Sequence, residues 1–243
     1  QSFVPTSWKE PDTTLTNNIR GQLNLLEAMR SSGHKCRIQI AGSSEEYGLV
    51  QPDEVPITED NPLRPLSPYA VSKVTQDMLA WQYFKSYDLD VVRTRGFNHT
   101  GPRRGDVFVV SNFAKQVAMI EAGLQGPVIL TGNLDATRDF TDVRDMVKGY
   151  LLCLEKGEPG AVYNLCSGRE IKIGDMLDML IELSPVEIER KLDPERMRPS
   201  DVMVLLGSAA KFHAATGWKP EIEFTKTLKD LLDYWRNRLA TNA

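Results

Sequence analysis

The chain has 243 residues, of which 41% are hydrophobic, and its formal net charge at pH 7 is -4. This length is enough for one large domain or two closely associated ones, with a sizeable core. Positive and negative side chains are mixed along the chain without a continuous basic face, which argues against a nucleic acid or an anionic membrane as partner and favours a small-molecule substrate.

No apolar run approaches the roughly 20 residues of a membrane span, and the start of the chain does not read as a signal peptide, so we expect a cytoplasmic protein. Three cysteines, Cys36, Cys153 and Cys166, lie far apart among apolar neighbours, which predicts buried free thiols. The three histidines are also scattered, and none has a second ligand at metal-binding spacing. We therefore expect no structural metal.

Helices and strands are predicted to alternate along the first 100 residues. Leu15, Ile19 and Leu26 recur at helical spacing, and Gly33 supplies a stop signal. The predicted elements are a helix over 13–32, a strand over 37–41, a helix over 67–87 and a strand over 89–95. This alternation is typical of βαβ units around a parallel sheet, so the predicted fold class is α/β.

The second part of the chain has a more mixed pattern. Helices are predicted near 110–120, 143–154, 174–183 and 228–239, and strands near 128–130, 162–166 and 186–191. The sequence contains no repeat and no low-complexity tract.

Tyr69 and Lys73 are four residues apart on a predicted helix, which places a phenol and an ammonium on one face. An ammonium near a phenol favours the phenolate and lowers the Tyr pKa from about 10, so that the Tyr can exchange a proton with a substrate carbonyl or hydroxyl. Such a pair is common on any exposed helix. Its meaning therefore depends on the rest of the sequence.

A polar loop, GSSEEYG over residues 42–48, directly follows a predicted strand, where an open parallel sheet presents its ligands. Simple turn chemistry is the alternative explanation of this loop. The joint pattern resembles the extended short-chain dehydrogenase/reductase family, in which a strand-end Ser or Thr four residues before Tyr-Gly joins a later Tyr-x-x-x-Lys. Ser43, Tyr69 and Lys73 match that set. The resemblance covers essentially the whole chain and implies a Rossmann-like doubly wound parallel sheet and an NADP or NAD cofactor.

Three further segments are similar to the GDP-mannose 4,6-dehydratases and the GDP-4-keto-6-deoxymannose reductases: FNHTGPRRG from residue 97, GNLDATRDF from residue 132 and RPSDV from residue 198. The resemblance implies substrate contacts for Asn98, Arg138, Arg198 and Asp201, and cofactor contacts for Tyr69, Lys73, His99 and Arg104. Guanidinium groups suit a diphosphate because they form paired hydrogen bonds with its oxygens. A surface ion pair is the alternative for each arginine.

The resemblance also implies the organisation of the chain. Residues 1–100, completed by about 141–168, would form the C-terminal part of an NAD(P)-binding Rossmann domain, and 101–140 with 169–243 a smaller α/β nucleotide-sugar domain. In family members, helices corresponding to 13–32 and 67–87 pair in a four-helix dimer interface, so we expect a homodimer. Leu25, Trp81 and Tyr83 would lie on the outward faces, with a core role as the alternative.

Glu45 bears on the type of reaction. In the dehydratases a glutamate at this position removes the C5 proton of the sugar, and Arg103 with Arg104 is also dehydratase-like. The reductases keep the same GSSEEYG segment, however, and the residues around Asn112 and Phe140 resemble the reductases. We favour a reductase that forms GDP-rhamnose from GDP-4-keto-6-deoxymannose with NADPH, and keep the GDP-mannose 4,6-dehydratase as the alternative.

In the reductase interpretation, Tyr69 protonates the alkoxide that develops at C4 while Ser43 hydrogen-bonds the same oxygen. Lys73 lowers the Tyr pKa and holds the nicotinamide ribose. Glu45 would then be an orienting or a vestigial acid.

Members of this family open with a strand and a Gly-x-x-Gly-x-x-Gly loop that cradles the cofactor pyrophosphate. The sequence contains no such loop, and Gln1-Ser2 resembles the segment that follows the family's fourth strand. The first βα units are therefore expected to precede residue 1. A third hypothesis follows, in which the chain is an inactive fragment that keeps the GDP-sugar site and cannot bind NADP tightly.

Overall fold

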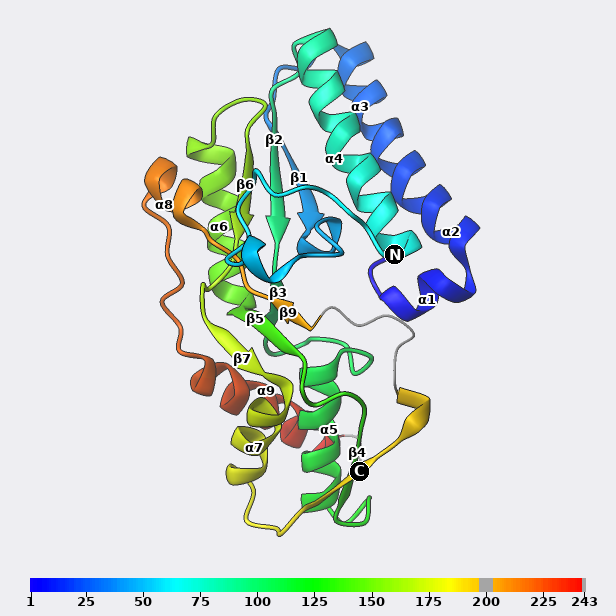
Figure 1. Ribbon diagram of the computed structural model, residues 1–243, viewed down its shortest axis with the longest axis vertical. Helices are drawn as coiled ribbons and strands as arrows, with labels where there is room; N and C mark the ends of the chain where they lie inside the picture. Colours follow the sequence, from blue (N-terminus) through cyan, green and yellow to red (C-terminus); the bar gives the residue numbers. More distant parts are fainter. Residues whose placement is uncertain (197–202, 242–243) are drawn as a thin grey trace.

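The computed structural model describes residues 1–196 and 203–241. Figure 1 shows two lobes stacked along the long axis, one around β1, β2 and β6 and one around α5, α7 and α9. The helices of the described residues are α1 (Val4–Lys9), α2 (Pro11–Leu15), α3 (Gly21–Ser32), α4 (Pro68–Tyr87), α5 (Val109–Glu121), α6 (Val143–Lys156), α7 (Ile173–Glu182), α8 (Ala210–Thr216) and α9 (Phe224–Ala240). The strands are β1 (Ile38–Ser43), β2 (Val91–Gly96), β3 (Asn98–Thr100), β4 (Val128–Thr131), β5 (Thr137–Asp142), β6 (Val162–Leu165), β7 (Glu170–Lys172), β8 (Glu189–Leu192) and β9 (Val204–Leu205).

The first lobe is a parallel sheet in the order β1-β2-β6, covered by α3 and α4 on one face and by α6 and α8 on the other (Figure 1). All six residues of β2 are buried, as expected for a central strand covered on both faces. Val91 packs with Leu26 and Ala80 beneath α3 and α4, whereas the next residue, Val92, packs with Met146 beneath α6. The predicted α/β class with a parallel sheet is confirmed.

The second lobe contains a mixed sheet in the order β3-β5-β7, with β9 also paired to β5, and a separate parallel pair of β4 and β8. Its core lies between α5, α7 and α9, where Val117, Leu177 and Leu231 are completely buried. Each of these helices repeats apolar residues at intervals of three and four, which turns one stripe toward the others.

The predicted helices and long strands are present, with boundary shifts of a few residues. The predicted helix over 13–32 is a continuous helical run in which a π-helical turn, Thr16–Arg20, joins α2 to α3. Six short elements were not predicted, because segments of two to seven residues show too little periodicity: α1, β3, β5, β7, β9 and α8.

One predicted burial is wrong. Cys36 is exposed, in contrast to Cys153 and Cys166, because it lies in the loop after α3 and not in a strand. For Tyr83 the structure shows the core role that was kept as the alternative: its ring is buried and its hydroxyl group donates a hydrogen bond to Glu27 of α3. Among the described residues, no helix is both long and apolar enough to cross a membrane.

Candidate functional site

Ser43 and Tyr69 meet where β1 ends and α4 begins. Ser43 is the last residue of β1, opposite Gly96 at the end of β2. Helix α4 starts at a Ser-Pro pair, where the Ser67 hydroxyl oxygen accepts a hydrogen bond from the Ala70 amide at 3.1 Å. This cap fixes the first turn, which carries Tyr69. The Ser43 side chain and the buried Tyr69 phenol are hydrogen-bonded to each other.

Lys73 lies one turn after Tyr69, with its ammonium nitrogen 5.8 Å from the centre of the Tyr69 ring. The ammonium group donates a hydrogen bond to the Ala41 carbonyl of β1 at 2.9 Å. Burial lowers the pKa of Lys73, and the nearby carboxyl group of Glu46 opposes that change. The structure therefore brings together Ser43, Tyr69 and Lys73, three of the four predicted catalytic residues; the fourth is Glu45.

The pKa of Tyr69 does not follow the prediction. The pKa is raised to about 12: burial is the main cause, the hydrogen bond from Ser43 opposes the rise, and the negative charge of Glu45 adds to it. The predicted lowering by Lys73 is not seen, since the Lys73 ammonium group is bonded to Ala41. Tyr69 therefore keeps its proton throughout the neutral pH range.

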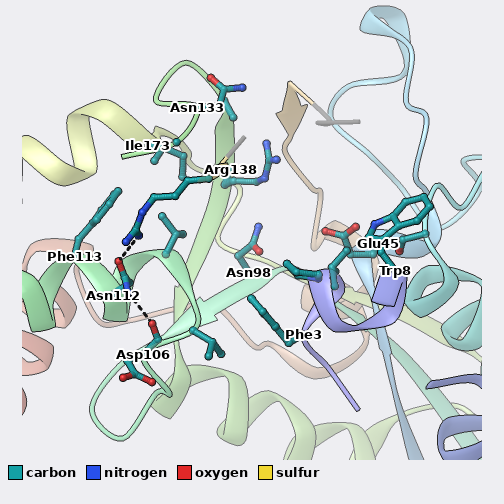
Figure 2. A pocket seen from close by; sticks show the side chains of 18 of the residues that line it. Phe3, Trp8, Glu45, Asn98, Asp106, Asn112, Phe113, Asn133, Arg138 and Ile173 are labelled. Atoms are coloured by element: carbon teal, nitrogen blue, oxygen red, sulfur yellow. Dashed lines mark hydrogen bonds between the residues drawn. The ribbon is translucent and has the colours of Figure 1, made fainter. Parts of the chain in front are cut away.

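A cleft of about 580 Å³ opens beside this set, between α1 and the second lobe. Figure 2 shows Glu45 and Trp8 at one end, Asn112 at the other, and Asn98 and Arg138 between them. Glu45 lies two residues after Ser43 and its charge acts on Tyr69, so one end of the cleft is adjacent to the phenol–serine pair. Three predicted site residues, Glu45, Asn98 and Arg138, thus line one cleft of a size suited to a small-molecule ligand.

His99 and Arg104 do not line the cleft. Arg104 interacts with Tyr69, and His99 interacts with Arg104. Burial lowers the pKa of both side chains, and the Arg104 guanidinium group interacts electrostatically with the Tyr69 and Tyr150 phenols. The His99 Nδ1 atom lies 3.0 Å from the Phe97 carbonyl oxygen. The other two predicted residues, Arg198 and Asp201, lie outside the described residues.

Three aromatic residues of the site were not predicted. Phe3 and Trp8, at the start and within α1, form one wall of the cleft. Tyr150 of α6 lies close to Gly96, since a Cβ atom added to this glycine would be 3.2 Å from the phenol oxygen. Pro5 in the first turn of α1 was the available signal for a helix, whereas nothing local marks Tyr150 as part of a site.

A strand-end serine, a Tyr-x-x-x-Lys helix and a ligand-sized cleft at the carboxyl edge of a parallel sheet together define an extended short-chain dehydrogenase/reductase. Comparison with known proteins identifies the family within this class. A sequence model of the family described as GDP-mannose 4,6 dehydratase matches residues 1–231. The chain belongs to this family.

Individual relatives include both reaction types. The chain is 39% identical to GDP-6-deoxy-D-mannose reductase of Pseudomonas aeruginosa, over 98% of this chain and 79% of that protein. It is 32% identical to GDP-mannose 4,6-dehydratase of Yersinia enterocolitica, over 91% of this chain and 67% of that protein. A solved structure of RMD from P. aeruginosa in complex with NADPH superposes with a TM-score of 0.93, at 39% identity, over 98% of this chain and 79% of that one.

Proposed function

We propose that this chain carries the active site of an NADP-dependent reductase that converts GDP-4-keto-6-deoxy-D-mannose to GDP-D-rhamnose. The observation that carries the proposal is the similarity to the P. aeruginosa reductase, which extends over 98% of the chain and exceeds that to the Y. enterocolitica dehydratase. NAD(P)H supplies the hydride for such a reduction.

Tyr69 is the proton donor in this proposal. Reduction of the C4 carbonyl places negative charge on its oxygen, and that oxygen must receive one proton. The Tyr69 phenol holds its proton at neutral pH because its pKa is raised to about 12. The Ser43 hydroxyl group, hydrogen-bonded to the phenol, donates to the same oxygen and stabilises its developing charge.

The residues around Tyr69 fit the nicotinamide half of NADP. Lys73 of α4, His99 of β3 and Arg104 of the loop after β3 contribute three polar side chains, and all are partly buried. Lys73 is suited to hold the ribose hydroxyls, since its ammonium has three donors and uses one on Ala41. His99 and Arg104 would hold the neighbouring part of the cofactor.

The cleft would hold the GDP-sugar. We assign the sugar to the end near Glu45 and Asn98, because this end adjoins the Ser43–Tyr69 pair. Arg138 would then face the diphosphate, for which a guanidinium group provides two parallel donors. The other end of the cleft, with Asn112 and Phe113, would receive the base.

The dehydratase alternative rests on Glu45. This carboxylate lines the cleft next to Tyr69 and could reach the C5 proton of a bound hexose. The inactive-fragment hypothesis is separate, since it concerns cofactor affinity and not the reaction.

Two assays distinguish these possibilities. The reductase proposal expects oxidation of NADPH that depends on GDP-4-keto-6-deoxymannose, with GDP-rhamnose as product. Formation of a 4-keto sugar from GDP-mannose without added reductant would instead identify a dehydratase. Calorimetric titration with NADPH tests the fragment hypothesis, which micromolar binding would contradict.

We extend the proposal to the organisation of the enzyme. Residues 1–100 and 141–168 would form the cofactor-binding domain, and 101–140 and 169–243 the substrate domain. A homodimer through helices 13–32 and 67–87 is supported by Leu25 and Trp81, which are 47% and 39% exposed on α3 and α4. Light scattering, which gives the molar mass in solution, tests whether the protein is a homodimer. The free thiols Cys153 and Cys166 support a reducing compartment such as the cytoplasm.

A further inference from the structure

Glu46 is a completely buried acid directly behind the catalytic serine. It is the last residue of a short 3-10 turn, Ser44–Glu46, that follows β1. One carboxylate oxygen, Oε1, accepts a hydrogen bond from the Ser43 amide at 2.7 Å. The other, Oε2, lies 3.3 Å from the Arg95 Nε atom of β2. A buried carboxylate with so few partners is costly, so its position calls for an explanation.

Gly42 leaves the space that the Glu46 carboxyl group occupies. A Cβ atom added to Gly42 would lie 2.4 Å from Glu46 Oε1 and 2.5 Å from the Thr94 carbonyl oxygen. Any side chain at position 42 would therefore displace the carboxylate from the end of β1. The glycine of the GSSEEYG segment makes room for an acid beneath the serine.

Arg95 connects Glu46 to the helix that carries the other catalytic residues. Its Nε and Nη2 atoms donate to Asp77 at 2.9 Å and 2.7 Å. Asp77 follows Lys73 by four residues and Tyr69 by eight, so all three lie on one face of α4. Arg95, Asp77 and Glu46 are each at least 95% buried.

We propose that Glu46 is a positioning residue of the reaction: it fixes the backbone at Ser43 and ties it, through Arg95 and Asp77, to the face of α4 that carries Tyr69 and Lys73. This inference rests on the proposed use of Ser43 and Tyr69 as the pair that serves the substrate oxygen. The serine and the tyrosine come from different elements, and the network of Glu46, Arg95 and Asp77 sets the distance between them. Misplacement by about 1 Å is enough to lower a rate about 100-fold.

The charge of Glu46 also acts on the proton donor. The groups that face it are Tyr69, Lys73 and Asp77 of α4 and Arg95 of β2. The pKa of Glu46 is raised to about 8: burial and the negative charge of Asp77 raise it, and Arg95 and the Ser43 amide oppose the change. Once ionised, Glu46 raises the pKa of Tyr69 and makes it a weaker acid. The rate of reduction is therefore expected to fall as the pH rises through about 8.

The test compares two substitutions of Glu46 with a matched control. Glu46→Gln keeps an oxygen that can accept from Ser43 but cannot ionise, and Glu46→Ala removes both properties. Glu54→Gln is the control, because Glu54 also ends a 3-10 turn, accepts a backbone N–H from Gln51 at 2.8 Å and pairs with Arg64 at 2.7 Å. Glu54 lies outside the catalytic set.

The expected kinetic result is a loss of kcat of roughly 10- to 100-fold in Glu46→Ala, with KM for the sugar nucleotide changed less than about threefold. Glu46→Gln retains most of kcat but loses the decline of the rate near pH 8. Glu54→Gln matches the wild type in both. An unchanged kcat in Glu46→Ala, or the same pH profile in Glu46→Gln as in the wild type, overturns the proposal.

A measurement without substrate separates this inference from the proposed function. In ¹⁵N-labelled full chain, the Ser43 amide proton is expected to shift as Glu46 ionises, in the wild type and in Glu54→Gln but not in Glu46→Gln. If the chemical shift of the Ser43 amide proton changes neither with pH nor with substitution of Glu46, the positioning role is refuted. Absence of turnover in a wild type that shows the shift refutes the proposed function alone.

Discussion

Asp139 of β5 holds the two lobes together, and its replacement by alanine should destabilise the protein strongly. Its carboxylate is completely buried and accepts hydrogen bonds from the Ser167 amide at 2.7 Å, the Ser167 hydroxyl at 2.6 Å and the Gly168 amide at 2.8 Å. A fourth donor, the Gly207 amide, is 3.4 Å away. One side chain therefore anchors the segments that follow β6 and β9 to β5.

The magnitude follows from three short hydrogen bonds to a charged acceptor, each contributing about 1.5–3 kcal/mol. Burial raises the pKa of Asp139, so removal of the carboxylate recovers part of a desolvation cost of several kcal/mol. We expect a net loss of about 4 kcal/mol in the free energy of unfolding for Asp139→Ala. A protein of this size should melt roughly 10 °C lower as a result.

Urea denaturation followed by circular dichroism measures this loss. Asp139→Asn keeps the shape but turns an amide donor toward backbone donors, so an intermediate loss of about 2 kcal/mol is expected. Asp135→Ala is the control: its side chain is 75% exposed in a single ion pair with Lys172, and a change below about 0.5 kcal/mol is expected. A loss below about 1 kcal/mol in Asp139→Ala would show that the buried hydrogen bonds contribute little, contrary to the reasoning above.

Three further predictions concern the site. Tyr69→Phe should lower kcat by about 10²- to 10⁴-fold with an unchanged circular dichroism spectrum, and a loss below tenfold would exclude Tyr69 as the proton donor. Arg138→Met should raise KM for the GDP-sugar about 30-fold or more while kcat changes little, as steady-state kinetics would show; an unaltered KM would remove Arg138 from the diphosphate site. Burial lowers the pKa of His99, so the unfolded chain binds a proton more readily and the wild type loses stability as pH falls below about 6.5. His99→Gln should lack that part of the loss in urea denaturation at pH 7 and pH 5, and equal losses in both proteins would contradict it.

The sequence was sufficient to predict the α/β class and the long elements, because α4 and β2 carry strong local patterns. Strand-end position and helix spacing marked Ser43, Tyr69 and Lys73 as candidates, and the resemblance to the short-chain dehydrogenase/reductase family joined them into one set. Glu45, Asn98 and Arg138 were assigned by resemblance, and the structure places all three on one cleft.

Other features depend on contacts that no local pattern reveals. The pKa of Tyr69 was mispredicted because helix spacing places Lys73 near the phenol but does not show that its ammonium group binds Ala41. Trp8 reaches the cleft only because α1 packs near the start of α4. Glu46 is indistinguishable from Glu45 by sequence, yet one is completely buried and the other lines the cleft.

The chain passes between the two lobes repeatedly, at Phe97 between β2 and β3, at the junction of β5 and α6, after β6 and after β9 (Figure 1). It returns once more between α8 and α9. Neither lobe is a continuous stretch of sequence, so neither can be exchanged with that of a relative by a single crossover. Recombination that respects this architecture needs a junction at every passage, and substrate preference is therefore expected to diversify through point substitutions around the cleft and not through shuffling of whole lobes.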